Sequence, residues 1–218
     1  MDVIRFQDVC PNVFVGIPDM PSGVWRQHLE FKKGETYLVE AGSGKGKSTF
    51  CSYLLGYRRD YQGNIFFDDS DVRRLTVAGW TAVRRRHVSC HVSCLFQELR
   101  LFPELTAWEN IEVKNRLTQW KSREEVGQWF VRMGIGDKMD AKVGMMSFGQ
   151  QQRVAMIRAL AQPFDFLLAD EPISHLDDAH AASMGVIMME EAQRQGAGVI
   201  VTSIGKHFDM RYSEVVHL

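Results

Sequence analysis

The sequence contains no apolar run that approaches the roughly 20 residues needed for a membrane-spanning helix. Its 26 Lys and Arg residues nearly balance 27 Asp and Glu residues, so no overall charge attracts nucleic acid or an anionic membrane. Residues 1–6 lack the basic-then-apolar pattern of a signal peptide. These absences predict a cytoplasmic protein with no nucleic-acid partner, and they leave attachment to a membrane partner open.

Cysteine is also scarce. Cys10, Cys51, Cys90 and Cys94 do not form a disulfide-dense pattern, and we expect them to be reduced. The last two lie in a tandem repeat of His-Val-Ser-Cys over residues 87–94, which invites a zinc interpretation. However, the repeat alternates apolar and polar residues as a half-buried strand does, and its His and Cys side chains would then point to opposite faces. We therefore favour a strand over a zinc site.

The most informative feature that is present is a glycine-rich turn between the apolar run 36–40, which reads as a buried strand, and a helix-like run from Ser48 onward. Such a turn can curl N–H groups around an anion, and the helix adds the positive end of its dipole. Lys47 is expected to reach the β- and γ-phosphates of a nucleotide, and Ser48 to ligate Mg²⁺. The predicted phosphate loop consists of Ala41, Gly42, Ser43, Gly44, Lys45, Gly46, Lys47, Ser48 and Thr49.

This loop departs from the strict pattern G-x-x-x-x-G-K-[ST] because Ala41 replaces its first glycine. Gly42 is expected to supply the positive φ that the turn needs. An ordinary glycine-rich turn that caps a helix is the alternative. The run Gly-Lys-Ser-Thr over residues 46–49, placed directly after a strand, favours the phosphate loop.

The order of apolar runs predicts an α/β protein. Strands are expected at 3–6, 25–31, 36–40, 63–68, 88–95, 164–169, 199–202 and 214–218, and helices at 77–86, 122–133, 147–161 and 177–195 and from Ser48 and Thr106. Buried strands that alternate with helices imply a largely parallel sheet covered on both faces. We expect one domain over residues 1–218, with a nucleotide-binding core at 1–97 and 161–218 and a helical subdomain at 98–160.

Two carboxylates follow the apolar strand 164–169, where open α/β sheets bind ligands. Asp170 is expected to hold Mg²⁺ directly or through a water molecule, and Glu171 to polarise the water that attacks the γ-phosphate. An acidic turn before Pro172 is the alternative for such a pair standing alone. The phosphate loop in the same chain favours the catalytic interpretation.

A second anion site is predicted at the start of a helix near residue 147. Ser147 and Gln150 match the capping box S-x-x-Q, which satisfies two helix N–H groups. A helix that begins in this way also attracts anions. The sequence therefore suggests that this site serves phosphates held by another subunit.

At this point the chain resembles the ATP-binding cassette (ABC) ATPases over nearly its whole length. Residues 146–150, Met-Ser-Phe-Gly-Gln, resemble the signature Leu-Ser-Gly-Gly-Gln, and Gln97 matches the glutamine loop. Residues 171–177 are similar to the segment that joins the catalytic glutamate to the D-loop. The resemblance implies an α/β P-loop NTPase fold, in which a mainly parallel core carries an antiparallel β subdomain and an inserted α-helical subdomain.

The resemblance also implies a head-to-tail dimer of two copies with two ATP molecules and Mg²⁺ at its interface. The phosphate loop of one copy and Ser147, Gly149 and Gln150 of the other would grip each ATP, with Asp177 assigned to the same site. Gln97 would help to hold Mg²⁺ and support catalysis. Closure on ATP would drive a transmembrane permease, which would contact the cassette near Gln97 and residues 98–103 and hold it at the inner face of the membrane.

Within the family, residues 101–111 look most like short importer cassettes and cassettes of lipoprotein release or macrolide export. An aromatic residue near the first strand stacks on adenine in such cassettes. Phe14 is our candidate by spacing and Trp25 the second, with a core position as the alternative for either.

The largest departure from the family pattern is Ser203, which stands where a switch histidine is expected after the strand 199–202. A serine hydroxyl is too short to approach the γ-phosphate except through water, so we expect slow hydrolysis with Glu171 as the base. Replacement by His175, His207 or Lys45 is one alternative, and each of these is weighed against an ordinary solvated side chain. A second alternative is a nucleotide switch that scarcely hydrolyses ATP. A third is a soluble cassette protein without a transport role.

Overall fold

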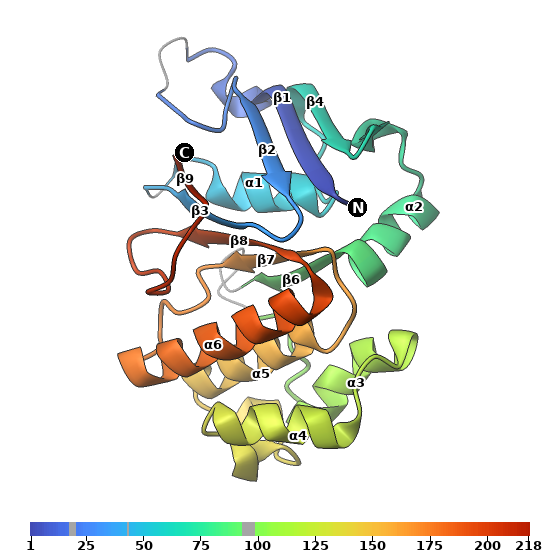
Figure 1. The fold of residues 1–218 in the computed structure, drawn as a ribbon, viewed down its shortest axis with the longest axis vertical. Coiled ribbons are helices and arrows are strands. Elements are labelled where there is room, and N and C mark those ends of the chain that lie inside the picture. Colours follow the sequence, from blue (N-terminus) through green and yellow to red (C-terminus); the bar gives the residue numbers. More distant parts are fainter. Residues whose placement is uncertain (18–20, 43, 93–98) are drawn as a thin grey trace.

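The computed structural model describes the chain except for residues 18–20, 43 and 93–98. An antiparallel sheet, a parallel sheet and several helices form successive layers, and helix α1 (Lys47–Leu54) lies between the two sheets (Figure 1). Helices α5 (Phe148–Leu160) and α6 (Asp178–Gln195) lie on the opposite side of the parallel sheet. The α/β fold predicted from the sequence is confirmed by this arrangement.

The parallel sheet contains five strands. Their order is β6 (Val88–Val92), β7 (Phe166–Asp170), β8 (Gly198–Ser203), β3 (Thr36–Glu40) and β9 (Glu214–His217), and each neighbouring pair is parallel. Every residue of β7 and β8 is buried. Such continuous apolar runs form strands here because helices cover both faces of the sheet. The carboxyl ends of β3, β7 and β8 consequently meet at one edge.

The antiparallel sheet has the order β2 (His28–Lys32), β1 (Val3–Pro11), β4 (Tyr61–Phe67) and β5 (Ser70–Asp71). Strand β2 alternates exposed and buried residues, since one face of this sheet packs on α1. Aromatic rings fill the space between them, and the rings of Phe6 and Phe50 stack with centroids 5.4 Å apart. This core holds α1, and therefore the loop before it, firmly against both sheets.

The remaining helices lie mainly between β6 and β7 in the sequence. They are α3 (Ala107–Thr118), α4 (Arg123–Arg132) and α5, while α2 (Val77–Ala82) precedes β6 through a π-helical turn (Val83–His87). Short 3₁₀ turns occur at Asn12–Phe14, Val72–Arg74, Gly136–Lys138 and Val143–Met145. Capping boxes begin α3, α4 and α5, which satisfies helix N–H groups and confirms the box predicted at Ser147. None of the described helices is long and apolar enough to cross a bilayer.

The structure corrects two strand predictions. The strand predicted at 25–31 begins only at His28, because Arg26 has a φ of 59° and turns the chain. The strand predicted at 88–95 runs over Val88–Val92 in its described part. Its first two residues, Val88 and Ser89, are 2% and 0% exposed, so the start of the strand is buried on both faces and not half-buried. The hydroxyl of Ser89 donates to the Ala159 carbonyl at 2.6 Å.

The zinc interpretation stays untested, because the side chains of Cys90, His91 and Cys94 lie outside the part of the chain that the structure describes. Among the described residues, no group of three or more His, Cys, Asp or Glu side chains could hold a metal ion by itself. His87 contacts the Asp165 carboxylate through Nδ1 at 2.6 Å. Cys10 and Cys51 are buried, and Cys94 lies outside the described residues.

Candidate nucleotide site

The predicted phosphate loop connects β3 to α1 at the carboxyl edge of the parallel sheet. Gly44 and Gly46 have φ values of 80° and 96°, whereas Gly42 is not among the glycines with positive φ, so its expected role was wrong. Gly46 is the residue directly before α1. A Cβ atom there would lie 3.0 Å from Cε2 of Phe14 and 3.2 Å from the Trp25 ring, which leaves room only for glycine.

Two hydrogen bonds hold the ends of this loop. The Ala41 N–H donates to the Ser203 carbonyl at 3.0 Å, and the Trp25 indole donates to the Lys45 carbonyl at 3.2 Å. Trp25 is 1% exposed and packs edge-on against Phe50. Its ring therefore supports the loop from the core and has no face for a base. Phe14 is half-buried beside Gly46 and stays our candidate for adenine stacking.

The side chains of the loop differ in their surroundings. The Lys47 side chain is 6% exposed and forms an ion pair with the Glu171 carboxylate. Ser48 is half-buried, Lys45 is exposed, and the Thr49 hydroxyl accepts from the Arg58 guanidinium at 3.0 Å. Ser43 lies outside the described residues. Of the loop, Lys47 is thus the charged side chain that points toward the predicted catalytic carboxylates.

The predicted carboxylates lie at the end of β7. Asp170 is fully buried and its Oδ1 accepts from the Thr202 hydroxyl, which lies opposite it in the register of β7 and β8. Burial raises the pKa of Asp170, while the Thr202 hydrogen bond and the Lys47 charge act in the opposite direction. Glu171 has a φ of 46°, a strained conformation for a residue with a side chain. Its N–H donates to the Thr202 carbonyl at 2.9 Å, which fixes this turn.

Ser203 ends β8 and is 1% exposed. Its hydroxyl donates to the Lys206 carbonyl at 2.7 Å and accepts from the Gly205 N–H at 3.1 Å. The hydroxyl therefore closes the loop that follows the strand. A catalytic role for Ser203 would require it to leave both bonds, and this role stays a prediction.

The two histidines considered as replacements are also engaged elsewhere. His207 contacts the Phe208 carbonyl through Nδ1 at 3.0 Å and lies edge-on to the Tyr212 ring. His175 contacts the Ser174 hydroxyl through Nδ1 at 2.9 Å and the Phe148 ring at a centroid distance of 4.7 Å. His207 Nε2 also lies 4.0 Å from the carboxylate of Glu40, directly before the phosphate loop. A role for either histidine stays a prediction.

The residues assigned to the second anion site form a cluster where α5 and α6 begin. The Ser147 hydroxyl accepts from the Gln150 N–H at 3.3 Å, and Gln150 Oε1 accepts from the Ser147 N–H at 2.9 Å. A Cβ atom on Gly149 would lie 3.2 Å from the Leu176 side chain, so the signature segment packs closely on the segment after Glu171. Asp177 caps α6, and hydrogen bonds from His180 lower the pKa of its carboxyl to about 2.

The structure therefore joins Lys47, Asp170 and Glu171 in one place, and the signature cluster packs on the far end of the segment 171–177. In the described part of the chain, the side-chain hydrogen bonds of Ser147 and Gln150 stay within their own capping box. Gln97 lies outside the described residues. Sequence reasoning missed Thr202, although its place at the end of an apolar strand beside β7 was a signal that could have identified it.

A family model described as "ABC transporter" matches residues 26–174 of the chain. The chain belongs to the ABC transporter family. The solved dimeric bacterial ABC transporter cassette MJ0796 has a TM-score of 0.76 and 26% identity, and covers 92% of this chain and 87% of its own. A second structure of MJ0796, in a post-hydrolysis state bound to ADP and Pi, has a TM-score of 0.74 and 25% identity over 92% and 87% of the two chains.

Curated relatives include the macrolide export ATP-binding/permease protein MacB of Shewanella sp. strain ANA-3, with 30% identity over 88% of this chain and 29% of the relative. An ABC transporter ATP-binding protein of Mycobacterium bovis, Mb2593, is 35% identical over 80% of this chain and 52% of its own length. The chain thus spans about a third to a half of the relatives it matches. The resemblance inferred from the motifs, and the ABC-type ATPase fold it implied, are both confirmed.

Proposed function

We propose that this ABC ATPase binds ATP with Mg²⁺ and hydrolyses it to power a membrane transport complex through nucleotide-driven dimerisation. The observation that carries the proposal is the convergence of Lys47, Asp170 and Glu171 at the carboxyl edge of one sheet. A cation beside two carboxylates, next to a loop with two glycines of positive φ, suits a Mg-bound triphosphate. The MJ0796 cassette bound to ADP and Pi supports the same choice of ligand.

In this proposal the N–H groups at the start of α1 and the Lys47 ammonium bind the phosphates. Mg²⁺, when bound, neutralises charge on the phosphate oxygens, and the donor set fits it because Ser48 and Asp170 offer the oxygen ligands that it prefers. Gln97 is assigned to the same site by the family pattern. Thr202 holds one oxygen of Asp170 and so orients the carboxylate.

Glu171 is the proposed general base. Its carboxylate accepts a proton from the water whose oxygen bonds to the γ-phosphorus, while the bond from that phosphorus to the β,γ-bridging oxygen breaks and ADP departs. For this step the Lys47 ammonium must exchange the carboxylate for phosphate oxygens. Nucleotide binding would then release the base at the moment when it is needed.

A second copy is proposed to complete the site through Ser147, Gly149, Gln150 and Asp177. A serine hydroxyl that accepts a bond at a helix cap still carries a proton that it can donate to a phosphate. Gly149 brings the backbone of α5 close to the surface of the D-loop segment. The dimeric MJ0796 cassette is in line with a head-to-tail pair.

The proposed partner is a transmembrane permease that places the cassette at the inner face of the membrane. The relative MacB, which the chain matches over 29% of its length, is named as an ATP-binding/permease protein. We also propose that residues 1–97 and 161–218 form the nucleotide-binding core and 98–160 the helical subdomain. Helices α3 and α4 lie far from the antiparallel sheet, in line with this division (Figure 1).

A nucleotide switch with scarcely any turnover is the second candidate, and the engaged hydroxyl of Ser203 is the observation that favours it. A soluble cassette without a transport role is a further alternative. Steady-state phosphate release from Mg-ATP tests the hydrolytic proposal. We expect slow but saturable turnover that requires Mg²⁺, and release at the rate of the uncatalysed reaction would favour the switch.

A further inference from the structure

One hydroxyl of the phosphate loop, that of Thr49, is held by an arginine from outside the loop. Thr49 is the third residue of α1 and is 9% exposed. Side chains of a helix tilt toward its N-terminus, so a hydroxyl in the first turn is directed to the end where helix N–H groups attract an anion. Its Oγ1 accepts a hydrogen bond from Nη1 of Arg58 at 3.0 Å. A guanidinium therefore lies beside the loop, in addition to the Lys47 ammonium.

The chain reverses after α1 and so brings Arg58 back toward the start of this helix. Gly56 has a φ of 69°, and a Cβ atom there would lie 2.4 Å from the Trp80 ring, so only glycine fits. The Tyr57 N–H then donates to the Ser52 carbonyl at 2.8 Å. The residues that follow Gly56 consequently run back alongside α1.

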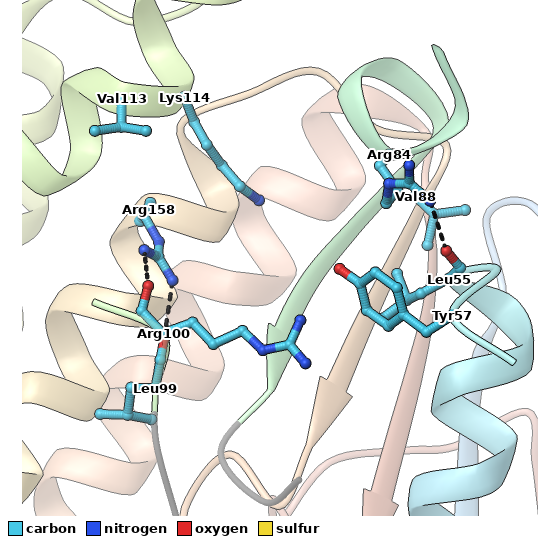
Figure 2. A pocket seen from close by; sticks show the side chains of 9 residues that line it. All are labelled: Leu55, Tyr57, Arg84, Val88, Leu99, Arg100, Val113, Lys114 and Arg158. Atoms are coloured by element: carbon cyan, nitrogen blue, oxygen red, sulfur yellow. Dashed lines mark hydrogen bonds between the residues drawn. The ribbon is translucent and has the colours of Figure 1, made fainter. Parts of the chain in front are cut away.

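Further contacts fix the end of α1. Arg84 donates to the Leu55 carbonyl at 3.0 Å (Figure 2). Tyr57 lies in the same groove, and the guanidinium carbons of Arg84 and Arg100 are 5.7 Å and 5.0 Å from the centroid of its ring. These contacts engage the residue directly before Arg58. The backbone that carries the Arg58 guanidinium therefore starts from a fixed point.

The Asp60 carboxylate holds the Arg58 guanidinium at two points. Nε of Arg58 donates to Oδ1 of Asp60 at 2.9 Å, and Nη2 forms an ion pair with Oδ2. The hydrogen bonds from Arg58 lower the pKa of the Asp60 carboxyl, which favours its ionised form. The third nitrogen, Nη1, donates to Thr49. Such a planar fork of donors is a property of arginine that lysine lacks.

The backbone of Asp60 is itself anchored to the turn that carries Phe14. Its carbonyl accepts from the Tyr53 hydroxyl at 3.0 Å and from the Asn12 N–H at 2.9 Å. Asn12 begins the 3₁₀ turn that contains Phe14, our candidate for adenine stacking. Asp60 thus joins this turn to the guanidinium that holds Thr49. Protein groups alone fix the guanidinium, which lowers the entropic cost of using it at the phosphates.

We infer that Arg58 is a positioning residue of the nucleotide site and acts through Thr49. A hydroxyl that accepts a bond from a guanidinium still carries a proton, which it can donate to a phosphate oxygen. The bond from Arg58 fixes the hydroxyl oxygen and polarises it, so that its own donation becomes stronger. The Asp60 carboxylate balances the guanidinium charge, and Arg58 therefore contributes direction more than net charge. The inference rests on the proposed function, to which it adds a residue outside the phosphate loop.

A double-mutant cycle on Mg-ATP affinity tests the inference. Arg58→Leu should weaken binding about fivefold and Thr49→Val about tenfold, because each removes part of one hydrogen-bond chain to phosphate. The double variant should bind about as weakly as Thr49→Val alone, since Arg58 acts only through the hydroxyl. Calorimetric titration into the full chain measures all four proteins. A loss of about fiftyfold in the double variant, which independent effects predict, would overturn the inference, as would unchanged affinity in Arg58→Leu.

Two further readouts separate positioning from charge. Arg58→Lys keeps the charge but not the fork, so it should bind Mg-ATP as weakly as Arg58→Leu does. Affinity at the wild-type level in Arg58→Lys would overturn the inference in favour of charge alone. The hydrogen bond acts equally before and during hydrolysis, so Arg58→Leu should raise KM about fivefold and leave kcat within about twofold. A lower kcat with an unchanged KM would also overturn the inference.

Arg132→Leu is the matched control. Arg132 also donates two bonds to one carboxylate, that of Glu190, but it lies on α4. Its loss should change Mg-ATP affinity less than about twofold, and Thr49→Ser, which keeps the hydroxyl, should do the same. A loss in Arg132→Leu equal to that in Arg58→Leu would overturn the inference.

Circular dichroism shows whether each variant folds, and Arg58→Lys takes the place of Arg58→Leu in the cycle if the latter does not. Wild-type chain that does not bind Mg-ATP would refute the proposed function. Wild-type chain that binds Mg-ATP no more tightly than Arg58→Leu or Arg58→Lys would refute this inference alone.

Discussion

The ammonium of Lys47 forms an ion pair with the carboxylate of Glu171, and so joins the phosphate loop to the turn after β7. The side chains are only 6% and 15% exposed, which makes their interaction stronger than that of a surface pair. A phosphate oxygen competes for the same ammonium. Nucleotide binding and the availability of the proposed base are therefore coupled through one side chain.

Glu171→Gln should abolish phosphate release and leave Mg-ATP affinity unchanged or higher. The amide cannot accept the proton of the attacking water, and it competes less well with phosphate for Lys47. Steady-state phosphate release and calorimetric titration measure the two effects. Glu190→Gln, which alters an exposed carboxylate of α6, is the control and should change neither. Unchanged turnover in Glu171→Gln would show that another group is the base.

Ser203→His should raise the rate of hydrolysis several-fold per folded molecule, because an imidazole reaches further than the serine hydroxyl and titrates near neutral pH. The same change breaks the bonds to Lys206 and Gly205 and should lower the melting temperature, since each bond contributes about 1 kcal/mol. Ser203→Ala breaks the same bonds without adding an imidazole. An equal rise in rate in Ser203→Ala would attribute the effect to loosening of the loop. No rise in Ser203→His would show that its role is already filled.

Asp170→Asn should increase the free energy of unfolding at pH 7 without Mg²⁺ and nucleotide. Burial raises the pKa of Asp170, so the folded chain binds this proton more tightly than the unfolded chain. Its contribution to stability therefore falls as pH rises from the ordinary carboxyl pKa through the raised one. The amide mimics the protonated form and can still accept from Thr202. Urea denaturation should show a gain at pH 7 that shrinks toward pH 4, and a loss at pH 7 would contradict the assignment.

Asp177→Asn is the opposite case and serves as a control for Asp170→Asn. The pKa of Asp177 is lowered to about 2 by hydrogen bonds from His180, so its stabilising contribution is present above the ordinary carboxyl pKa and is lost as pH falls toward 2. Asp177→Asn should therefore lower stability at pH 7. In Asp170→Asn, the factor by which Mg²⁺ increases the affinity for ATP should fall about tenfold or more, because the variant lacks a carboxylate that holds the ion.

Ser147→Ala should lower stability by about 1 kcal/mol, through loss of a helix cap, and should also reduce ATP turnover strongly. The matched control is Ser122→Ala. Ser122 caps α4 with the same reciprocal bonds, to Glu125 where Ser147 has Gln150. Its loss should therefore lower the free energy of unfolding by a similar amount. Denaturation and phosphate release on both variants separate the two roles. An equal fall in turnover in both would reduce Ser147 to a structural residue.

The fold could be predicted because its strands and helices carry strong local signals. The strand before the phosphate loop has the predicted bounds, since Thr36–Glu40 is a short apolar run between turns. The start of β2 could not be predicted, because the positive φ of Arg26 depends on packing against β1 and has no mark in the sequence. The burial of Ser89 was missed for a similar reason, since a bond to α5 satisfies its hydroxyl.

The site was predicted less completely than the fold. Motif spacing brought out Lys47, Asp170 and Glu171, but the ion pair between Lys47 and Glu171 depends on the order of the sheet, which places β3 and β7 on either side of β8. The hydrogen bond from the Ser203 hydroxyl to the Lys206 carbonyl also could not be predicted, because no local sequence pattern indicates it. Motif spacing therefore identifies the residues of the site but does not predict which side chains from different elements pair with one another.

Calorimetric titration of Mg-ATP into the full chain and into Lys47→Ala tests the central claim most directly. The wild-type chain should bind saturably, and Lys47→Ala should lose about tenfold to a hundredfold in affinity, because a charge-assisted bond to phosphate contributes about 1.5–3 kcal/mol. Lys138→Ala, at an exposed lysine paired with Asp137, should bind as the wild type does. No heat of binding with the wild type, or equal affinity in Lys47→Ala, would contradict the account.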